Sequence, residues 1–489
     1  MPPEAPARRA RWWAPRPHEV LVVGMAAHVA VFGRLGANQH RRFGTFGFDM
    51  GIFDQGIWLL SQFEDPFVTV RGLNYFGNHL NLGTVLFVPF YWLGAGPVFL
   101  SVAQTVVVAL GAVPIWLLGR DRLASGWLAL GVALAFLLHP ATEWISWWQF
   151  HPDALAITPL LFAYWFASRR RWRWFGVCVA LTLVWKEDAA MAVFALGLVL
   201  VVTRRWRAGL VTSGVALVWF LLATEVLIPR ATGGLGPFYG EFYSGFGDGA
   251  AEIAFNMARH PSRLVAEATE PATVEYYRRL FLPVGLLALA APVSLGVALP
   301  HLVVNTVSSH PLTHDIRYQY SSLIIAAIFL ATVEAIAWMG RRRSWRAVLV
   351  VVVLVSAVLA NRAWSPSPLG VAYRSGIWVS VGPNQAAAEQ AVGMVPAGAG
   401  VSATFQLVPH LTHRARIYEF PNPWKLSYWG VKGENPPDPL DVDYLVVDTA
   451  SLGASRALYD SLVGPGRDFQ VVFSSGTIAV ARRGPALPG

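Results

Sequence analysis

Long apolar runs recur along most of this chain, and short basic clusters separate them. A full membrane crossing needs roughly 20 apolar residues, and incomplete spans are tolerated where they pack within protein or line a cavity. The runs lie at residues 20–36, 80–118, 123–139, 154–167, 174–185, 189–202, 210–228, 280–307, 321–339 and 347–360. The pattern predicts a mainly α, polytopic transmembrane helical bundle.

The basic clusters predict how this bundle is oriented, because Arg and Lys concentrate in cytoplasmic loops. If every cluster is cytoplasmic, residues 80–118 contribute one net crossing and residues 280–307 contribute two. This gives about eleven crossings, a cytoplasmic N-terminus and an extracytoplasmic C-terminus. Gly94, Gly96 and Pro97 interrupt the region 80–118, which is therefore either a re-entrant piece plus a span or two spans. The clusters lie at residues 8–11, 120–122, 169–173, 204–207 and 341–346.

The composition changes after the last apolar run to that of a soluble α/β segment. Alternating and β-branched stretches predict strands at residues 377–381, 400–404, 444–448, 469–473 and 478–481. Residues 384–392 and 456–463 read as helices. The chain therefore divides into a cytoplasmic tail (1–19), a transmembrane domain (20–362) and a small extracytoplasmic α/β domain (363–489).

The overall composition supports lipid as the solvent of this chain. Hydrophobic residues make up 55% of it and charged residues only 14%, whereas a soluble domain carries roughly a quarter charged residues. The net charge of +9 comes from the loop clusters, so no nucleic-acid partner is expected. The one cysteine, Cys178, excludes an intrachain disulfide. Abundant Ala, Arg, Gly and Val suggest a GC-rich bacterial genome, and hence a bacterial plasma membrane.

Ionisable residues gather in the segments that this topology places outside the membrane. Asp49 is expected to cap an amphipathic helix that lies on the membrane surface. Charges near the membrane are costly, and they usually pair, face a cavity or serve function. The candidate site residues are Asp49, Asp54, His79, His151, Asp153, Lys186, Glu187, Asp188, His310, His314, Arg317 and Tyr318.

These residue types suit displacement of a phosphate leaving group. A carboxylate supplies a general base, while Lys, Arg and His can hold a phosphate. Metal binding is a rival interpretation, with Asp49, His79, Asp153 or His310 as ligands, so a divalent metal stays possible although no metal site is assigned. The chain has no helical metal motif, Gly-rich phosphate loop, nucleophile elbow or kinase signature.

Several of these segments resemble a known but uncharacterised family. Residues 48–55, 150–154 and 186–188, with residues 408–414 and 417–421 in the soluble tail, resemble bacterial and archaeal predicted membrane proteins of domain-of-unknown-function family 2079. The resemblance extends from about Gly33 to Ala481. That family is similar in layout to the GT-C glycosyltransferases, which use polyprenyl-phosphate-linked sugars outside the cytoplasm.

This resemblance implies a role for several candidates. Asp49, or Asp54 as second candidate, would deprotonate the acceptor hydroxyl for a single, inverting displacement. Lys186 and Arg317 would neutralise the lipid phosphate, and His151 and His314 would orient it or the sugar. The implied partners are a lipid-linked sugar donor, a glycan, lipid or protein acceptor, and membrane lipids. No second carboxylate directly follows Asp49, unlike the commonest pattern of the wider group, which leaves metal dependence and acceptor class open.

Two other functions compete with glycosyl transfer. A secondary transporter or flippase would show corresponding broken helices in two symmetric halves, and no such repeat is found. A non-catalytic envelope assembly protein would need no converging carboxylates. The soluble domain could bind the acceptor glycan, bind a partner or cover the cavity, with Trp424 and Trp429 as candidates for stacking on a sugar.

Overall fold

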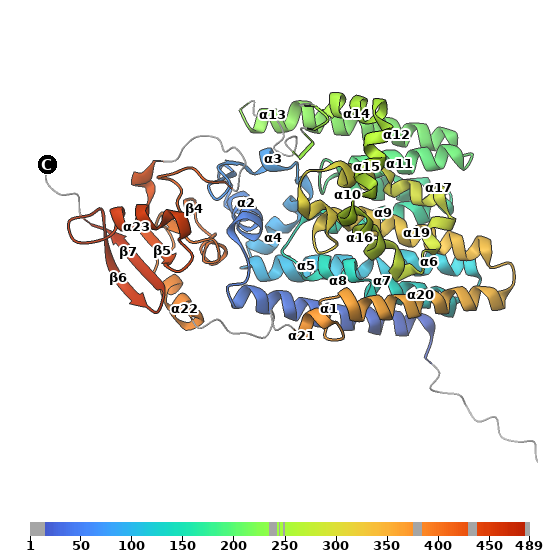
Figure 1. The fold of residues 1–489 in the computed structure, drawn as a ribbon, viewed down its shortest axis with the longest axis horizontal. Coiled ribbons are helices and arrows are strands. Elements are labelled where there is room, and N and C mark those ends of the chain that lie inside the picture. The colour runs from blue at the N-terminus through green and yellow to red at the C-terminus, as the bar shows by residue number, and fades with distance from the viewer. Residues whose placement is uncertain are drawn as a thin grey trace, which may run out of the picture.

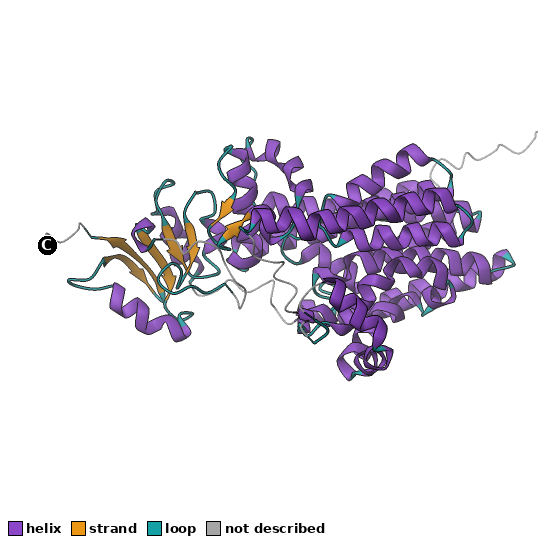
Figure 2. Ribbon diagram, turned by 90° about the horizontal axis from the view of Figure 1, so that it is seen from above, coloured by secondary structure: helices purple, strands orange, loops and turns teal. Residues whose placement is uncertain are grey.

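The protein consists of a helical bundle with a small mixed sheet packed against one end (Figure 1; Figure 2). The computed structural model describes residues 15–233, 242–243, 245–247, 250–374, 384–428 and 438–484. The first helix begins at the end of the bundle remote from the sheet and runs toward it (Figure 1).

The helices of the bundle match the apolar runs closely, and the run at residues 189–202 coincides with a helix end to end. The structure thus confirms a mainly helical protein. The long helices are α1 (Pro17–Arg41), α5 (Pro97–Leu110), α6 (Ala112–Leu123), α7 (Gly126–Leu138), α8 (Pro140–Trp147), α9 (Pro152–Ser168), α10 (Trp172–Leu183), α11 (Ala189–Val202), α12 (Trp206–Leu222), α19 (Ser322–Met339) and α20 (Arg343–Trp364). Helix α12 continues into α13 (Ile228–Ala231), and α14 (Ala250–Arg259), α15 (Pro261–Thr269) and α16 (Pro271–Phe281) follow along the chain.

Many of these helices have the length and apolarity of membrane spans. Within the described residues, five helical stretches meet both criteria, and a sixth does if the pair α7 and α8, bent by 52°, is one broken span. Shorter apolar helices accompany them at Leu82–Tyr91, Trp172–Leu183, Ala189–Val202 and Pro292–Val307. The chain is therefore a membrane protein with several apolar helices.

The two regions whose crossings are hardest to count from the sequence, residues 80–118 and 280–307, have different structures. Residues 80–118 form a short piece, Leu82–Tyr91, followed by one long span in which α5 continues into α6. This matches the expectation of a re-entrant piece plus a span.

Residues 280–307 run along the bundle and return as a chain of short helices. The Leu280 carbonyl accepts from His139 near the start of α8, whereas the Ser294 hydroxyl bonds Tyr164, which also bonds Glu334 near the far end. Broken backbone of this kind is tolerated at membrane depth because neighbouring protein encloses it. The pieces are η5 (Leu282–Val284), η6 (Leu287–Ala290), α17 (Pro292–Leu295), η7 (Gly296–Ala298) and α18 (Leu299–Val307).

The basic clusters converge at the end of the bundle remote from the sheet. Arg122 forms an ion pair with Glu334 at 2.9 Å, and Arg346 donates to the Leu123 carbonyl at 3.2 Å. Arg205 lies within electrostatic reach of Arg122. The helices thus carry their cationic loops on one side, as the charge pattern predicts.

The C-terminal domain is a five-stranded sheet with two flanking helices. Its strand order is β4-β3-β5-β7-β6, in which β3 pairs in parallel with β4 and β5, and β7 pairs antiparallel with β5 and β6. The sequence predicts every one of these elements except β4, and the predicted strand at 377–381 lies outside the described residues. The elements are α22 (Gln385–Gly393), β3 (Val401–Ala403), β4 (Ile417–Glu419), β5 (Tyr444–Asp448), α23 (Arg456–Leu462), β6 (Phe469–Ser475) and β7 (Ile478–Arg483).

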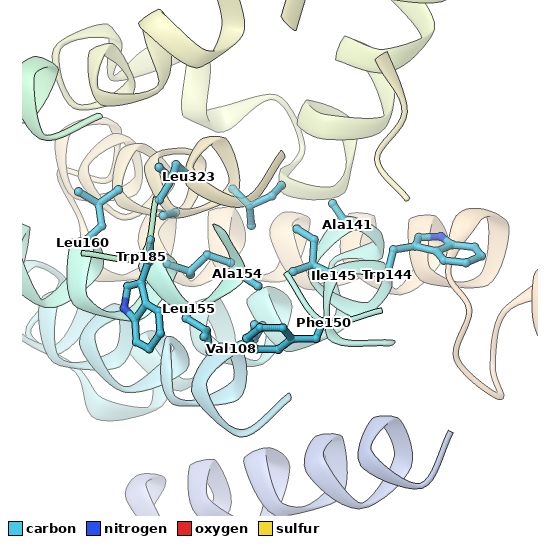
Figure 3. Close-up of a cluster of buried hydrophobic side chains, with 14 of the residues drawn as sticks. Val108, Ala141, Trp144, Ile145, Phe150, Ala154, Leu155, Leu160, Trp185 and Leu323 are labelled. Carbon is cyan, nitrogen blue, oxygen red and sulfur yellow. The ribbon is translucent and has the colours of Figure 1, made fainter. Parts of the chain in front are cut away.

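A buried apolar cluster fills the bundle below its sheet-domain end. Figure 3 shows the side chains of Ile145, Phe150, Leu155 and Trp185 within it, and each is at most 7% exposed. Phe150 immediately precedes His151, so this packing fixes the position of the loop that carries the histidine.

The segment after α1 does not form the membrane-surface helix that the sequence predicts. Asp49 lies inside a π-helical turn, η1 (Gly47–Gly51), and caps no helix. The helix that follows, α2 (Ile52–Ser61), is enclosed: Ile57 is fully buried, and Gln55 donates to the Arg414 carbonyl of the sheet domain at 3.2 Å. The apolar face exists, but bundle and sheet domain cover it in place of lipid.

The close packing of α2 allows a test of whether this helix is enclosed by protein. A Cβ on Gly56 would lie 2.1 Å from the ring of Tyr75, which is 1% exposed. We predict that Gly56→Ala lowers the free energy of unfolding by about 1–3 kcal/mol, because an overpacked helix must shift. Thermal unfolding of the purified protein measures this. The control is Gly176→Ala, where a Cβ meets no atom within 4 Å, and equal melting temperatures of the two variants would contradict the packing.

Candidate active site

Asp49 and His151 face each other where the bundle meets the sheet domain. The His151 Nε2 lies 3.5 Å from the Asp49 Oδ1, and the Asp49 side chain is 35% exposed while that of His151 is buried. The Gln149 side-chain oxygen accepts from the backbone N–H groups of Phe46 and Met50, which fixes the turn around Asp49. The pair thus offers a reachable carboxylate on a rigid backbone.

The hydrogen bond made by Nδ1 of His151 determines which ring nitrogens must carry a proton. Its Nδ1 donates to the Gln149 carbonyl at 2.8 Å, so Nε2 faces Asp49 favourably only when it also carries a proton. Burial in the loop between α8 and α9 opposes the charged form, but Asp49 and, more weakly, Asp153 outweigh it and raise the pKa of His151. The nearby carboxylates therefore favour the charged form of His151.

Lys186 lies between two carboxylates at the start of α11. Its ammonium is 2.8 Å from the Asp153 Oδ1 and 3.2 Å from the Asp188 Oδ2, and its side chain is 7% exposed. An ammonium group has three N–H donors. The two carboxylates engage two of them, which leaves one donor for an anionic ligand.

Glu187 holds the loop that carries Lys186. It is 1% exposed, its Oε1 lies 2.7 Å from the Nδ1 of His79, and its Oε2 accepts from the backbone N–H of Leu80. His79 and Glu187 therefore pin the short piece at 82–91 to the start of α11. Both residues therefore lie beside Lys186 and hold the loop that carries it.

Further residues that the sequence did not single out complete the cluster. Tyr320 lies within electrostatic reach of Lys186, Asp49 and Asp153, and His301 within reach of Lys186 and Asp188. Both ring nitrogens of His301 are buried without a hydrogen-bond partner among the described residues. The only sequence signal for His301 is that a histidine stands inside the apolar run 280–307.

Asp54 belongs to a separate cluster between the bundle and the sheet domain. It is fully buried, and it accepts from the Tyr91 hydroxyl at 2.6 Å and the Thr412 hydroxyl at 2.5 Å. His413 Nε2 lies 3.2 Å away, and the effect of Asp54 outweighs partial burial to raise the pKa of His413. This arrangement gives Asp54 a part in joining the two domains.

The candidates from residues 310–318 do not reach Lys186. His310 stacks on Phe242 with ring centroids 4.4 Å apart, and the His314 Nε2 lies 3.3 Å from the Thr306 carbonyl. Arg317 is half-exposed and pairs with Asp315 at 2.6 Å. Of this group, Tyr318 comes nearest to the site, within electrostatic reach of Asp49.

A cavity of about 600 Å³ lies between the bundle and the sheet domain. One side presents the aromatic rings of Phe46, Trp148 and Tyr318. The other side presents polar groups of the sheet domain, among them Gln385 and Gln406. Tyr318 on the cavity wall lies within electrostatic reach of Asp49.

The donor set of the cluster does not fit a metal centre. Among the described residues, no three His, Cys, Asp or Glu side chains are grouped so that they could hold a metal ion. Asp153 and Asp188 instead share the Lys186 ammonium. No chemical step is therefore derived through a metal.

Fold and site together define a class: a polytopic membrane protein with a polar, ionisable site where its helical bundle meets a small soluble domain. Within this class, the chain belongs to the family described as "Predicted membrane protein (DUF2079)", which matches residues 39–461. This confirms the resemblance that the sequence motifs indicate. No curated protein matches the chain.

Solved structures identify the fold. The crystal structure of ArnT from Cupriavidus metallidurans bound to undecaprenyl phosphate matches with a TM-score of 0.53 and 14% identity, covering 96% of this chain and 99% of ArnT, and the apo structure gives the same values. The Archaeoglobus fulgidus oligosaccharyltransferase in complex with Zn and sulfate matches with a TM-score of 0.41 and 13% identity, over 90% of this chain and 69% of that one. The likeness to ArnT confirms the GT-C-like fold.

The Lys186 ion pairs generate a prediction about stability. We expect Lys186→Met to lower the free energy of unfolding by about 3–5 kcal/mol, because two carboxylates would lose their shared cation in a buried site. Thermal unfolding measures the loss, and adding Asp153→Asn and Asp188→Asn should restore part of it. Lys425→Met, at an exposed lysine, is the matched control. A Lys186 variant as stable as this control would show that the ammonium is not needed there.

Proposed function

We propose that the protein is a glycosyltransferase that moves a sugar from a polyprenyl-phosphate-linked donor to an extracytoplasmic acceptor. One observation carries the proposal: a reachable carboxylate, Asp49, and a buried ammonium, Lys186, both lie within electrostatic reach of Tyr320 in a GT-C-like bundle. ArnT, which shares the fold, was crystallised with undecaprenyl phosphate. A phosphate of that kind is the leaving group that the proposed chemistry needs.

Asp49 acts as the general base in this proposal. Its carboxylate takes the proton of an acceptor hydroxyl while the hydroxyl oxygen attacks the anomeric carbon of the donor sugar. The bond from that carbon to the phosphate oxygen breaks, and the electron pair leaves with the polyprenyl phosphate. A single displacement inverts the configuration at the anomeric carbon.

Lys186 and His151 stabilise the departing phosphate. The third N–H of the Lys186 ammonium donates to a phosphate oxygen, and the charge on His151 offsets the surrounding carboxylates. Because the site is largely closed to water, such interactions are stronger than they would be in solution. His301 adds a buried imidazole on the far side of Lys186 and is a further candidate for phosphate contact.

The proposal includes a location and a topology. With the basic end in the cytoplasm, the sheet domain and Asp49 face the outside of a bacterial plasma membrane. In this topology residues 280–307 would supply two incomplete crossings enclosed by protein, and a total of about eleven crossings needs both of them. The lipid-linked donor would enter the site from the outer leaflet.

Asp49→Asn tests the base directly. We predict that it lowers the rate of sugar transfer by about 10²–10⁴-fold, because an amide cannot accept the proton. The assay uses full-length protein in lipid and a panel of undecaprenyl-phosphate sugars. Asp54→Asn is the matched control, which should lower the melting temperature and leave the rate of the folded enzyme intact. If Asp54→Asn abolishes transfer in folded protein while Asp49→Asn does not, the base is Asp54.

Cysteine labelling tests the orientation. In a Cys178→Ala background, which removes the one native cysteine, Ser451→Cys places a thiol on the exposed sheet domain and Ser344→Cys places one at the basic end. We predict that a membrane-impermeant maleimide labels the first variant in intact cells and the second only after lysis. The reverse pattern would put the site in the cytoplasm and contradict an extracytoplasmic transfer.

A further inference from the structure

The cavity between the two domains has two chemically different walls. The bundle wall is aromatic, with Phe46, Trp148 and Tyr318 half-buried, and Trp148 packs edge-on against Tyr318 with centroids 5.2 Å apart. The wall from the sheet domain is polar and uncharged over much of its area, with Gln385 and Gln406 among its side chains. The volume of the cavity, about 600 Å³, lies in the range of pockets that bind small molecules.

The polar wall has hydrogen-bonding capacity that the described protein does not use. The Gln385 side-chain oxygen is buried without a donor, although its Nε2 donates to Glu389 at 2.7 Å. Gln406 has no side-chain hydrogen bond among the described residues. A buried acceptor without a partner is unfavourable, so a ligand with hydroxyl groups would be favoured here.

This combination of walls matches one class of ligand. A sugar ring presents C–H groups on its faces, which pack on aromatic rings, and hydroxyl groups at its edge, which bond amides and carboxylates. A hydrocarbon chain would leave the glutamine groups without partners. Arg42 and Arg317 also line the cavity, and Asp315 pairs with Arg317 at 2.6 Å, which offsets the charge that Arg317 would offer to a phosphate. The Asp448 carboxylate on the same wall further favours a hydroxyl-bearing ligand over an anion.

We propose that this cavity binds the saccharide of the acceptor, and that Gln385 and Gln406 of the sheet domain hold its hydroxyl groups. The assignment rests on the proposed function and deepens it by making the acceptor a glycan. Lys186 is not among the residues that line this cavity, whereas Tyr318 on its wall lies within electrostatic reach of Asp49, which is beside His151. In this proposal the donor phosphate binds at Lys186 and the acceptor sugar binds in the cavity, so the two substrates occupy different parts of the site.

The test is glycan binding by the full-length protein in lipid nanodiscs, measured on an array of defined neutral, acidic and amino-sugar oligosaccharides. We expect wild type to bind at least one of them, and Gln385→Ala/Gln406→Ala to weaken that Kd by at least about tenfold (about 1.4 kcal/mol). Gln390→Ala, at an exposed glutamine of the same helix α22, should bind as wild type does. The double variant should bind undecaprenyl phosphate with unchanged affinity.

Three outcomes overturn the assignment: wild type binds no oligosaccharide, the double variant binds as tightly as wild type, or the double variant loses affinity for undecaprenyl phosphate. The last would make the cavity a lipid-phosphate site. Failure of the proposed function has a different signature, in which oligosaccharide binding persists but Lys186→Met leaves undecaprenyl-phosphate binding unchanged.

Discussion

The site depends on holding one ammonium between two carboxylates at the edge of an apolar bundle. Removing an ion from water to such a position costs several kcal/mol, and attraction offsets this only when the geometry is close. Asp153 at the start of α9 and Asp188 before α11 provide that geometry for Lys186. The ends of these helices are therefore fixed relative to each other, and Asp49 and His151 take their places against a rigid frame.

Broken backbone around this frame makes room for the polar groups. The segment 280–307 runs through the bundle in short helical pieces and places His301 within electrostatic reach of Lys186. The sheet domain closes the other side by covering α2 through Gln55 and Asp54. The bundle alone would leave α2 and the aromatic wall exposed, so the soluble domain is part of the site's architecture.

Much of the fold could be predicted because strong local patterns coincide with real elements. The run 189–202 is apolar throughout and is bounded by Asp188 and Thr203, which set the ends of α11, and β5 is likewise marked by its β-branched core. Strand β4, only three residues long, gives no such pattern, and its pairing with β3 comes from tertiary contact.

The site itself was only partly predictable, because spatial grouping depends on helix phase and long-range packing. Asp49 and Asp54 are close in sequence, but Asp49 lies in the π-helical turn η1 and Asp54 lies in the α-helix α2, so their side chains leave the backbone in different directions. Asp54 therefore faces Thr412 and the sheet domain while Asp49 faces His151. Arg317 lies over the ring of Tyr318 and lines the same cavity. His310 instead stacks on Phe242, and His314 lies near the Thr306 carbonyl. No local sequence pattern carries that information.

The most direct measurement is an experimental structure of the full-length protein in lipid nanodiscs with undecaprenyl phosphate bound. The account predicts that the phosphate hydrogen-bonds the Lys186 ammonium, with the Asp49 carboxylate facing the position of the anomeric carbon. A phosphate bound away from Lys186, or one whose anomeric position Asp49 cannot reach, would contradict it.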